Sequence, residues 1–294
     1  ATESAPITIY ATRTEASARS GLLADYPGAA AAYSLRLLDT DYTGSAIRVR
    51  RASDNAEQDI GFDGNGDLDT TSLATFCSGT NGFVKTWYDQ AGANDATQTT
   101  TTSQPKIYDS ATGVVLDEDS NNAIYFEGDD FFNNITTSTN TAPHSSFVVA
   151  QRTDSRRQIY GFGGGSAFNH FELSFWTSDL IRVFAGDGST YTDYSSLAGP
   201  DSLTHLISTI YNATTLQMDV DGSNEISASE SKTSSNTLSI ANRNVSPFYF
   251  TEFVLYLSDQ SANRTGIETN INDNYLIHSQ SPTGLLADYP GAAA

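Results

Sequence analysis

Short runs in which apolar and polar residues alternate recur along most of the chain. In residues 46–51, Ile47 and Val49 alternate with Arg48 and Arg50, which predicts a strand with one buried face. Turn residues such as Asp-Gly and Gly-Gly separate many of these runs, and many short strands at this spacing predict a sandwich or jelly roll. Ten further strands are expected at 83–88, 123–127, 146–152, 158–162, 171–176, 180–185, 203–211, 216–220, 237–241 and 248–257.

Three segments have the pattern of a helix instead. Pro27 suits a first helical turn, and the alanines after it would continue that helix as far as residue 38. A second, short helix is expected over residues 70–77. The third runs from 261 to 277, where Ile267, Ile271 and Tyr275 recur every four residues, and Ser258 or Asp259 is the expected cap. The helices are few, so they are expected to flank the sheets.

An eleven-residue segment occurs twice. Residues 21–31 read GLLADYPGAAA, and residues 284–294 repeat them at an offset of 284 − 21 = 263. Either the chain is one unit of a tandem array, or the second copy docks on a neighbouring subunit where the first copy docks on its own. A cloning accident is the third explanation. We therefore divide the chain into an N-terminal arm (1–20), one sandwich (21–278) and a C-terminal linker (279–294).

The charge and the cysteine content of the chain limit the partners and the kinds of site that we expect. The chain has 15 Lys and Arg against 35 Asp and Glu, a net charge of −20, which disfavours nucleic acid and anionic membranes as partners. It has no apolar run of 18 residues, so no membrane insertion is expected. The single cysteine, Cys77, follows an apolar stretch and is expected to be a buried core thiol. The abundance of Thr, Ser, Asn and Gly is typical of exported β-proteins, so the expected location is extracellular or on a virion or other particle surface.

Two stretches, residues 46–62 and 73–100, carry a family resemblance. They include the element Tyr88-Asp89-Gln90-Ala91-Gly92-Ala93-Asn94. Together they resemble the first part of the catalytic domain of the arabinofuranosidase B family, in which a YDQSGN element follows an arginine-bearing strand. The resemblance implies a concanavalin-A-like β-sandwich.

The later part of the chain resembles laminin-G-like domains. Residues 123–130 resemble their F-D-G strand, and residues 250–256 their closing strand. The composite, covering roughly residues 21–278, is similar to modules of marine bacterial exoproteins and of phage structural proteins. The expected fold is therefore all-β, a concanavalin-A-like jelly-roll sandwich with a few short flanking helices.

Candidate site residues follow from the chemistry of sugars. Glycoside hydrolysis needs two carboxyl groups beside the bond, and the strand carboxyls Glu172 and Glu252 lie among apolar residues that raise a pKa. The resemblance assigns no catalytic residue, because no stretch after Pro105 matches the family's catalytic segments and its adjacent cysteine pair is absent. Candidate glycan-binding residues are Trp87, Tyr88, Asp89, Asn94 and Trp176.

One loop has the spacing of a calcium site. Asp63, Asn65, Asp67 and Asp69 place oxygen ligands at every second residue, which suits Ca²⁺. The loop opens like an EF-hand but has Ala74 where the bidentate Glu would stand, so an ordinary polar turn is the alternative. No cofactor other than calcium is expected.

The sequence thus favours a non-catalytic surface or virion module for adhesion or structure. Such a module would bind glycan, copies of itself or neighbouring structural proteins. The alternative is an α-L-arabinofuranosidase-like glycoside hydrolase.

Overall fold

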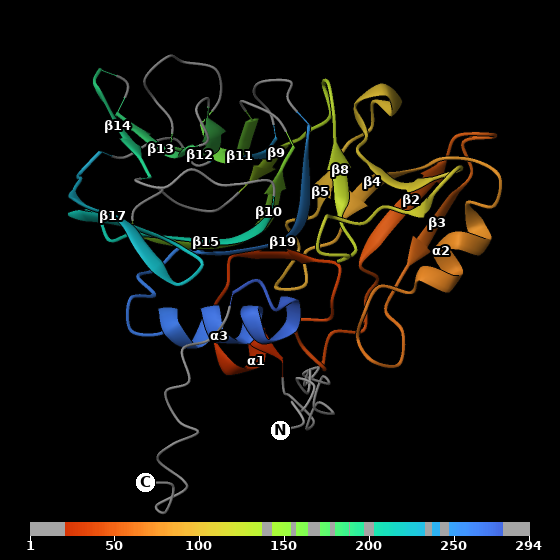
Figure 1. The fold of residues 1–294 in the computed structure, drawn as a ribbon, viewed down its shortest axis with the longest axis horizontal. Coiled ribbons are helices and arrows are strands. Elements are labelled where there is room, and N and C mark those ends of the chain that lie inside the picture. Colours follow the sequence, from red (N-terminus) through yellow and green to blue (C-terminus); the bar gives the residue numbers. More distant parts are fainter. Residues whose placement is uncertain are drawn as a thin grey trace, which may run out of the picture.

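The chain forms two antiparallel sheets packed face to face (Figure 1). The structure is a computed structural model. It describes residues 21–278 except 137–142, 154–156, 164–170, 177–179, 188, 197–202, 233–236 and 242–246. The N-terminal arm and the C-terminal linker, with the second copy of the repeat, lie outside the described residues. The all-β sandwich expected from the strand pattern is confirmed.

The larger sheet has thirteen strands. Its order is β17 (Ser223–Ser229), β16 (Thr215–Val220), β15 (Thr204–Tyr211), β10 (His144–Arg152), β19 (Phe248–Tyr256), β8 (Ile124–Phe126), β6 (Lys106–Asp109), β4 (Gly82–Trp87), β2 (Ile47–Arg51) and β3 (Glu57–Ile60). Three more strands pair beside this path: β1 (Ala31–Ser34) on β19, β5 (Ala96–Thr97) on β4 and β7 (Gly113–Val114) on β6.

The smaller sheet has six strands and lies across the core from β10 and β19. Its order is β14 (Tyr191–Ser195), β13 (Leu180–Gly186), β12 (Phe171–Trp176), β11 (Arg157–Phe162), β18 (Thr237–Ile240) and β9 (Phe132–Thr136).

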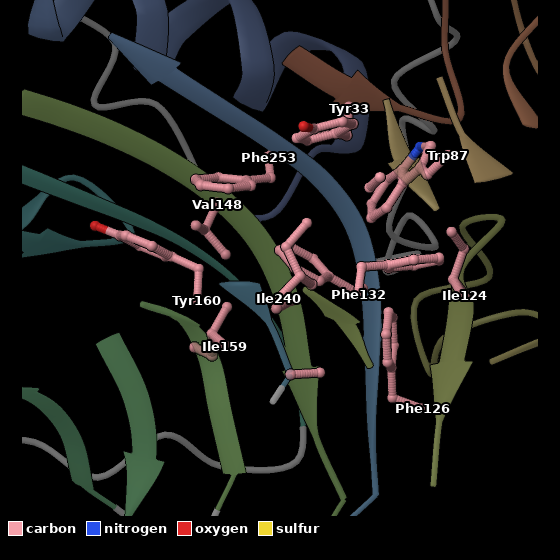
Figure 2. Packing of buried hydrophobic residues seen from close by; sticks show 14 of the residues in the cluster. Tyr33, Trp87, Ile124, Phe126, Phe132, Val148, Ile159, Tyr160, Ile240 and Phe253 are labelled. Atoms are coloured by element: carbon pink, nitrogen blue, oxygen red, sulfur yellow. The ribbon is translucent and has the colours of Figure 1, made fainter. Parts of the chain in front are cut away.

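Aromatic residues fill the space between the two sheets. Tyr160 of the small sheet stacks on Phe253 of the large sheet, with ring centroids 4.8 Å apart. Figure 2 shows this pair beside Val148, and Phe132 and Phe126 further along the same layer. Stacked and edge-to-face ring pairs pack closely in this layer, and this packing fixes the orientation of the two sheets relative to each other.

Helices cover the edges and one outer face. The helix α3 (Arg264–Tyr275) and the short α1 (Leu22–Asp25) lie against the outer face of the large sheet, while α2 (Thr70–Phe76) lies near β3 (Figure 1). The expected helices at 70–77 and 261–277 are confirmed. The expected caps of the latter are wrong: α3 begins after Asn263, and Asp259 instead accepts from the backbone N–H of Ser261 in a preceding turn.

The helix expected after Pro27 is also wrong. The helix α1 ends at Asp25, Gly28 has a φ of 96°, and Ala31–Ser34 form the strand β1. Register pairs Ala31 with Leu255 of β19, and the N–H of Ala30 donates to the Leu255 carbonyl at 2.7 Å. Pairing with a long, buried strand outweighs the high helix propensity of the alanines, because tertiary contacts routinely override intrinsic propensity.

The first copy of the repeat is tied to the body of the protein. The backbone of Gly21 has a φ of 96°, and a Cβ there would collide with the Leu38 carbonyl oxygen, so only glycine fits. Leu22 and Leu23 are buried in an apolar cluster with α3 and the outer face of β10 and β19, and the Tyr256 hydroxyl donates to the Tyr26 carbonyl at 2.7 Å.

Two further expectations meet the structure. Cys77 is buried, and burial raises the pKa of its thiol to about 11, which makes it a core residue rather than a nucleophile. Within the described ranges, no helix is long and apolar enough to span a membrane.

Replacing Leu22 tests how firmly the first copy of the repeat is attached to the body of the protein. We expect Leu22→Ala to lower the free energy of unfolding by about 2–5 kcal/mol, because it leaves a cavity beneath α3. The matched control is Leu276→Ala, whose side chain is 71% exposed, with an expected change within about 0.5 kcal/mol. Urea unfolding followed by tryptophan fluorescence measures both, and equal losses would contradict the attachment.

Candidate functional site

The element that carries the family resemblance has a structural role in this fold. The buried carboxylate of Asp89 accepts hydrogen bonds from the backbone N–H groups of Ala32, Ala91 and Asn94 at 2.8–3.0 Å. Burial raises the pKa of Asp89, and these three donors act in the opposite direction. The side-chain amide of Asn94 donates to the Ala30 carbonyl at 2.8 Å. Asp89 and Asn94 therefore anchor the backbone around β1.

The aromatic residues beside this element make contacts within the protein. Trp87 is fully buried beside Tyr33, with ring centroids 5.7 Å apart (Figure 2). Its ring also lies 5.4 Å from that of Phe250. Tyr88 donates its hydroxyl to Asp59 at 2.7 Å, and burial, followed by this bond, raises the pKa of Tyr88 to about 12. The structure thus separates Trp87 and Tyr88 from the remaining candidate, Trp176, which lies on the smaller sheet.

The two candidate strand glutamates have different environments. Glu252 is fully buried on the α3 side of the large sheet. Its carboxylate receives the Arg36 guanidinium at 2.7 and 2.9 Å, the Ser34 hydroxyl at 2.8 Å and the Tyr275 hydroxyl at 2.9 Å. Burial alone would lower the pKa of Arg36, but the charge of Glu252 raises it overall. Every oxygen of Glu252 is engaged in holding β1, β19 and α3 together.

Glu172 belongs to the outer face of the six-stranded sheet. Its neighbours Phe171 and Leu173 enter the core, so alternation along β12 directs Glu172 to the opposite face. It is nonetheless only 3% exposed. Glu172 and Glu252 therefore lie on opposite outer faces of the sandwich, and the structure does not join them into a catalytic pair.

A missing side chain makes room beside Glu172. Gly161 of β11 stands opposite Glu172 in register. A Cβ at Gly161 would lie 2.5 Å from the amide nitrogen of Gln158 and 2.9 Å from the Phe171 carbonyl oxygen. The Gln158 amide occupies this space and approaches the Glu172 carboxylate at 3.5 Å. The glycine therefore lets a neutral donor sit beside a buried acid.

Aromatic and charged side chains continue this face across β12, β13 and β14. The Arg182 guanidinium lies 3.8 Å from the centre of the Trp176 ring and forms an ion pair with Asp193. Phe184 and Tyr191 stack, with ring centroids 4.9 Å apart and planes at 16°. We call this set of outward-facing side chains, together with Gln158, the Glu172 face: Gln158, Glu172, Trp176, Arg182, Phe184, Tyr191 and Asp193.

The second acid of the Glu172 face, Asp193, is not adjacent to Glu172. Glu172 pairs with Phe184, and Phe184 pairs with Asp193 on the next strand. Because neighbouring strands lie about 4.8 Å apart, the two acidic residues have Cα atoms about 10 Å apart. Asp193 is also bound to Arg182. The segments that precede β11, connect β12 to β13 and follow β14 contain Asp154, Asp179 and Asp201, and these residues lie outside the described ranges.

The candidate calcium loop uses its oxygens for its own backbone. One Asp63 oxygen accepts from the N–H groups of Asn65 and Asp67 at 2.8 and 3.1 Å. Asp69 caps α2 by accepting from the N–H and hydroxyl of Ser72. Among the described residues, no three His, Cys, Asp or Glu side chains are grouped so that they could hold a metal ion. The geometry is that of a polar turn followed by a capped helix.

Sequence reasoning proposed Glu172 and Trp176 of the Glu172 face as site residues, and it did not find Gln158, Arg182, Phe184 or Asp193. Arg182 lies in an expected strand and has apolar neighbours on both sides. This alternation could have predicted that its side chain lies on the outer face of the sheet. Asp193 was not findable in this way, because β14 has an almost wholly polar sequence and was not expected as a strand.

Solved structures share this fold. The chain superimposes on a variant of a GH54 α-L-arabinofuranosidase soaked with 4-nitrophenyl α-L-arabinofuranoside, with a TM-score of 0.69, 16% identity, and coverage of 87% of this chain and 66% of that one. An arabinofuranosidase complexed with arabinofuranosyl-α-1,2-xylobiose gives a TM-score of 0.62 at 14% identity, covering 85% and 64%. The chain therefore spans slightly less than two thirds of the length of these structures. Among curated proteins, no sequence matches significantly.

These structures define a β-sandwich of the arabinofuranosidase type. The family model for the catalytic domain of α-L-arabinofuranosidase B matches residues 23–169, which is half of the chain. The chain belongs to this family.

The two strand glutamates give a direct test of their different environments. We expect Glu252→Gln to lower the free energy of unfolding by about 3–5 kcal/mol, because it leaves the buried Arg36 charge without its partner. Glu172→Gln keeps the shape of a side chain that lies beside the neutral Gln158 amide, and should change stability by less than about 1 kcal/mol. Urea denaturation measures the free energy of unfolding of both variants. A decrease for Glu172→Gln as large as that for Glu252→Gln would contradict the different environments of the two glutamates.

Proposed function

We propose that the protein is a glycoside hydrolase that releases terminal α-L-arabinofuranosyl residues. The observation that carries the proposal is the family membership together with a buried carboxyl, Glu172, on a polar and aromatic sheet face. This is the alternative drawn from the sequence, and the family match favours it over the non-catalytic surface module. Adhesion and a virion location stay predictions.

The Glu172 carboxyl faces a hydrogen-bond donor. The Gln158 amide nitrogen lies 3.5 Å from one of its oxygens, so that oxygen acts as an acceptor. An ionised carboxylate can attack the anomeric carbon as a nucleophile, or can activate water as a base. We therefore assign Glu172 one of these two roles, and the role of general acid falls to another carboxyl.

The rest of the Glu172 face suits a sugar. The Trp176 ring and the Phe184–Tyr191 stack provide apolar surfaces for the C–H groups of a furanose ring. Arg182 and Asp193 provide donors and acceptors for hydroxyl groups beside them. In the proposed reaction the glycosidic bond breaks, water adds to the anomeric carbon, and the leaving sugar oxygen takes a proton.

Substitution of Glu172 tests the proposal. We expect Glu172→Gln to lower the rate of release of 4-nitrophenol from 4-nitrophenyl α-L-arabinofuranoside by roughly a thousandfold or more, with an unchanged unfolding midpoint. The matched control is Glu252→Asp, which keeps the buried charge and lies on the other side of the sandwich. Wild-type protein that releases no sugar from aryl or polymeric arabinofuranosides would overturn the proposal.

Azide separates the two roles of Glu172. In Glu172→Ala, azide can attack the anomeric carbon in place of the carboxylate, so that arabinofuranosyl azide forms as 4-nitrophenolate leaves. Recovery of activity with azide, and detection of that product, shows that Glu172 acts at the anomeric carbon. Retention of the anomeric configuration in the arabinose released by the wild type then assigns the nucleophile, and inversion assigns the base.

The general acid is found by comparing two substrates. Because 4-nitrophenolate leaves with little help from an acid, a variant lacking the acid should keep activity on the aryl substrate and lose roughly 10²–10⁴-fold on an arabinose-containing oligosaccharide. The variants to compare are Asp154→Asn, Asp179→Asn, Asp193→Asn and Asp201→Asn.

A further inference from the structure

A second aromatic surface lies on the other side of the sandwich. Tyr125 of β8 and Tyr249 of β19 are directly paired in register, and their ring centroids are 5.0 Å apart at an angle of 42°. The residues that flank them along the two strands, Phe126, Phe248 and Phe250 among them, point into the core. Alternation therefore turns both tyrosines to the outer face of the large sheet, away from the Glu172 face.

The two rings line a groove. Its volume is about 360 Å³, and its other walls come from β6, β7 and the segment after β7. Leu116 lies at this groove with 47% of its surface exposed, although it is a large apolar residue. We call this the tyrosine groove: Lys106, Asp109, Thr112, Val114, Val115, Leu116, Tyr125 and Tyr249.

The charges of the tyrosine groove are balanced within the protein. The Lys106 ammonium lies 3.3 Å from Asp109 and 3.8 Å from Glu127, and it also stands 5.9 Å from the centre of the Tyr125 ring. No excess positive charge therefore faces an occupant, and the net charge of −20 repels an anionic one. An uncharged occupant fits these electrostatics.

The surface chemistry of the groove fits a carbohydrate. Tyrosine rings offer flat apolar faces for sugar C–H groups, while their hydroxyls, Thr112 and the Lys106–Asp109 pair offer hydrogen-bond partners for sugar hydroxyls. A mixed lining of this kind, with a volume at the lower end of the range for ligand sites, accommodates roughly one or two sugar units of a longer chain.

We propose that the tyrosine groove is a binding site for neutral polysaccharide, separate from the Glu172 face. It holds a stretch of polymer on the outer face of the large sheet, while the Glu172 face stays available for a side-chain sugar. Binding in the groove does not require hydrolysis, so this proposal and the hydrolase proposal can fail independently.

Native gel electrophoresis with soluble polymer in the gel tests the groove. The probes are arabinoxylan and linear arabinan as neutral polymers, and polygalacturonate as an anionic one. We expect at least one neutral polymer to retard the wild-type protein and polygalacturonate not to retard it. Tyr125→Ala and Tyr249→Ala should each weaken retardation roughly tenfold, the Tyr125→Ala/Tyr249→Ala double variant should abolish it, and Tyr249→Trp should retain it.

Two controls separate the groove from the candidate catalytic face. Tyr191→Ala removes a tyrosine of the Glu172 face that is 51% exposed, and Glu172→Gln removes the candidate catalytic carboxyl, so both should be retarded like the wild type. Urea midpoints show whether each variant folds. The proposal is overturned if no neutral polymer retards the wild type, if the folded double variant is retarded as before, or if Tyr191→Ala alone loses retardation. Retardation without any arabinose release would overturn the hydrolase proposal and leave this one standing.

Discussion

A single buried carboxylate joins the parts of this sandwich that are farthest apart in sequence. Glu252 on β19 binds Arg36 and Ser34 near β1 and Tyr275 at the end of α3. Removing two charges from water costs several kcal/mol each, and only close, fully hydrogen-bonded geometry offsets that cost. The position of β1 and the seating of α3 on the large sheet both depend on this group. It also gives an acid that lies amid apolar residues a structural role.

The Glu172 face shows the opposite use of a buried acid. Glu172 has the Gln158 amide beside it, and the adjoining space comes from a glycine on the next strand. In sequence the two acids look alike, because each lies next to apolar residues on a strand whose side chains alternate between the two faces of a sheet. What separates them is the element that covers each sheet face, and strand periodicity carries no information about that.

The strand pattern predicted much of the fold but little of the site. Each of the eleven expected strands overlaps an observed one, since alternation and long apolar runs are strong signals when a face is buried. Short or polar strands such as β5, β7 and β14 have too few buried positions to be recognised. The Tyr88–Asn94 element identified the family correctly, yet its residues turned out to support backbone, because a polar motif can be kept for the hydrogen bonds that it supplies to a neighbouring segment.

The pairing of β1 with β19 has a consequence for how the protein is made. Ala31 meets Leu255, a separation of 255 − 31 = 224 residues. At typical rates of translation, on the order of ten to forty seconds pass between the synthesis of these two residues. During that interval Leu22, Leu23 and the edge of β1 have neither α3 nor β19 to cover them. Until β19 has left the ribosome, the nascent chain exposes an apolar segment and an unpaired strand edge that can aggregate. The synthesis of β19 therefore sets the time at which β1 can be paired and protected from aggregation.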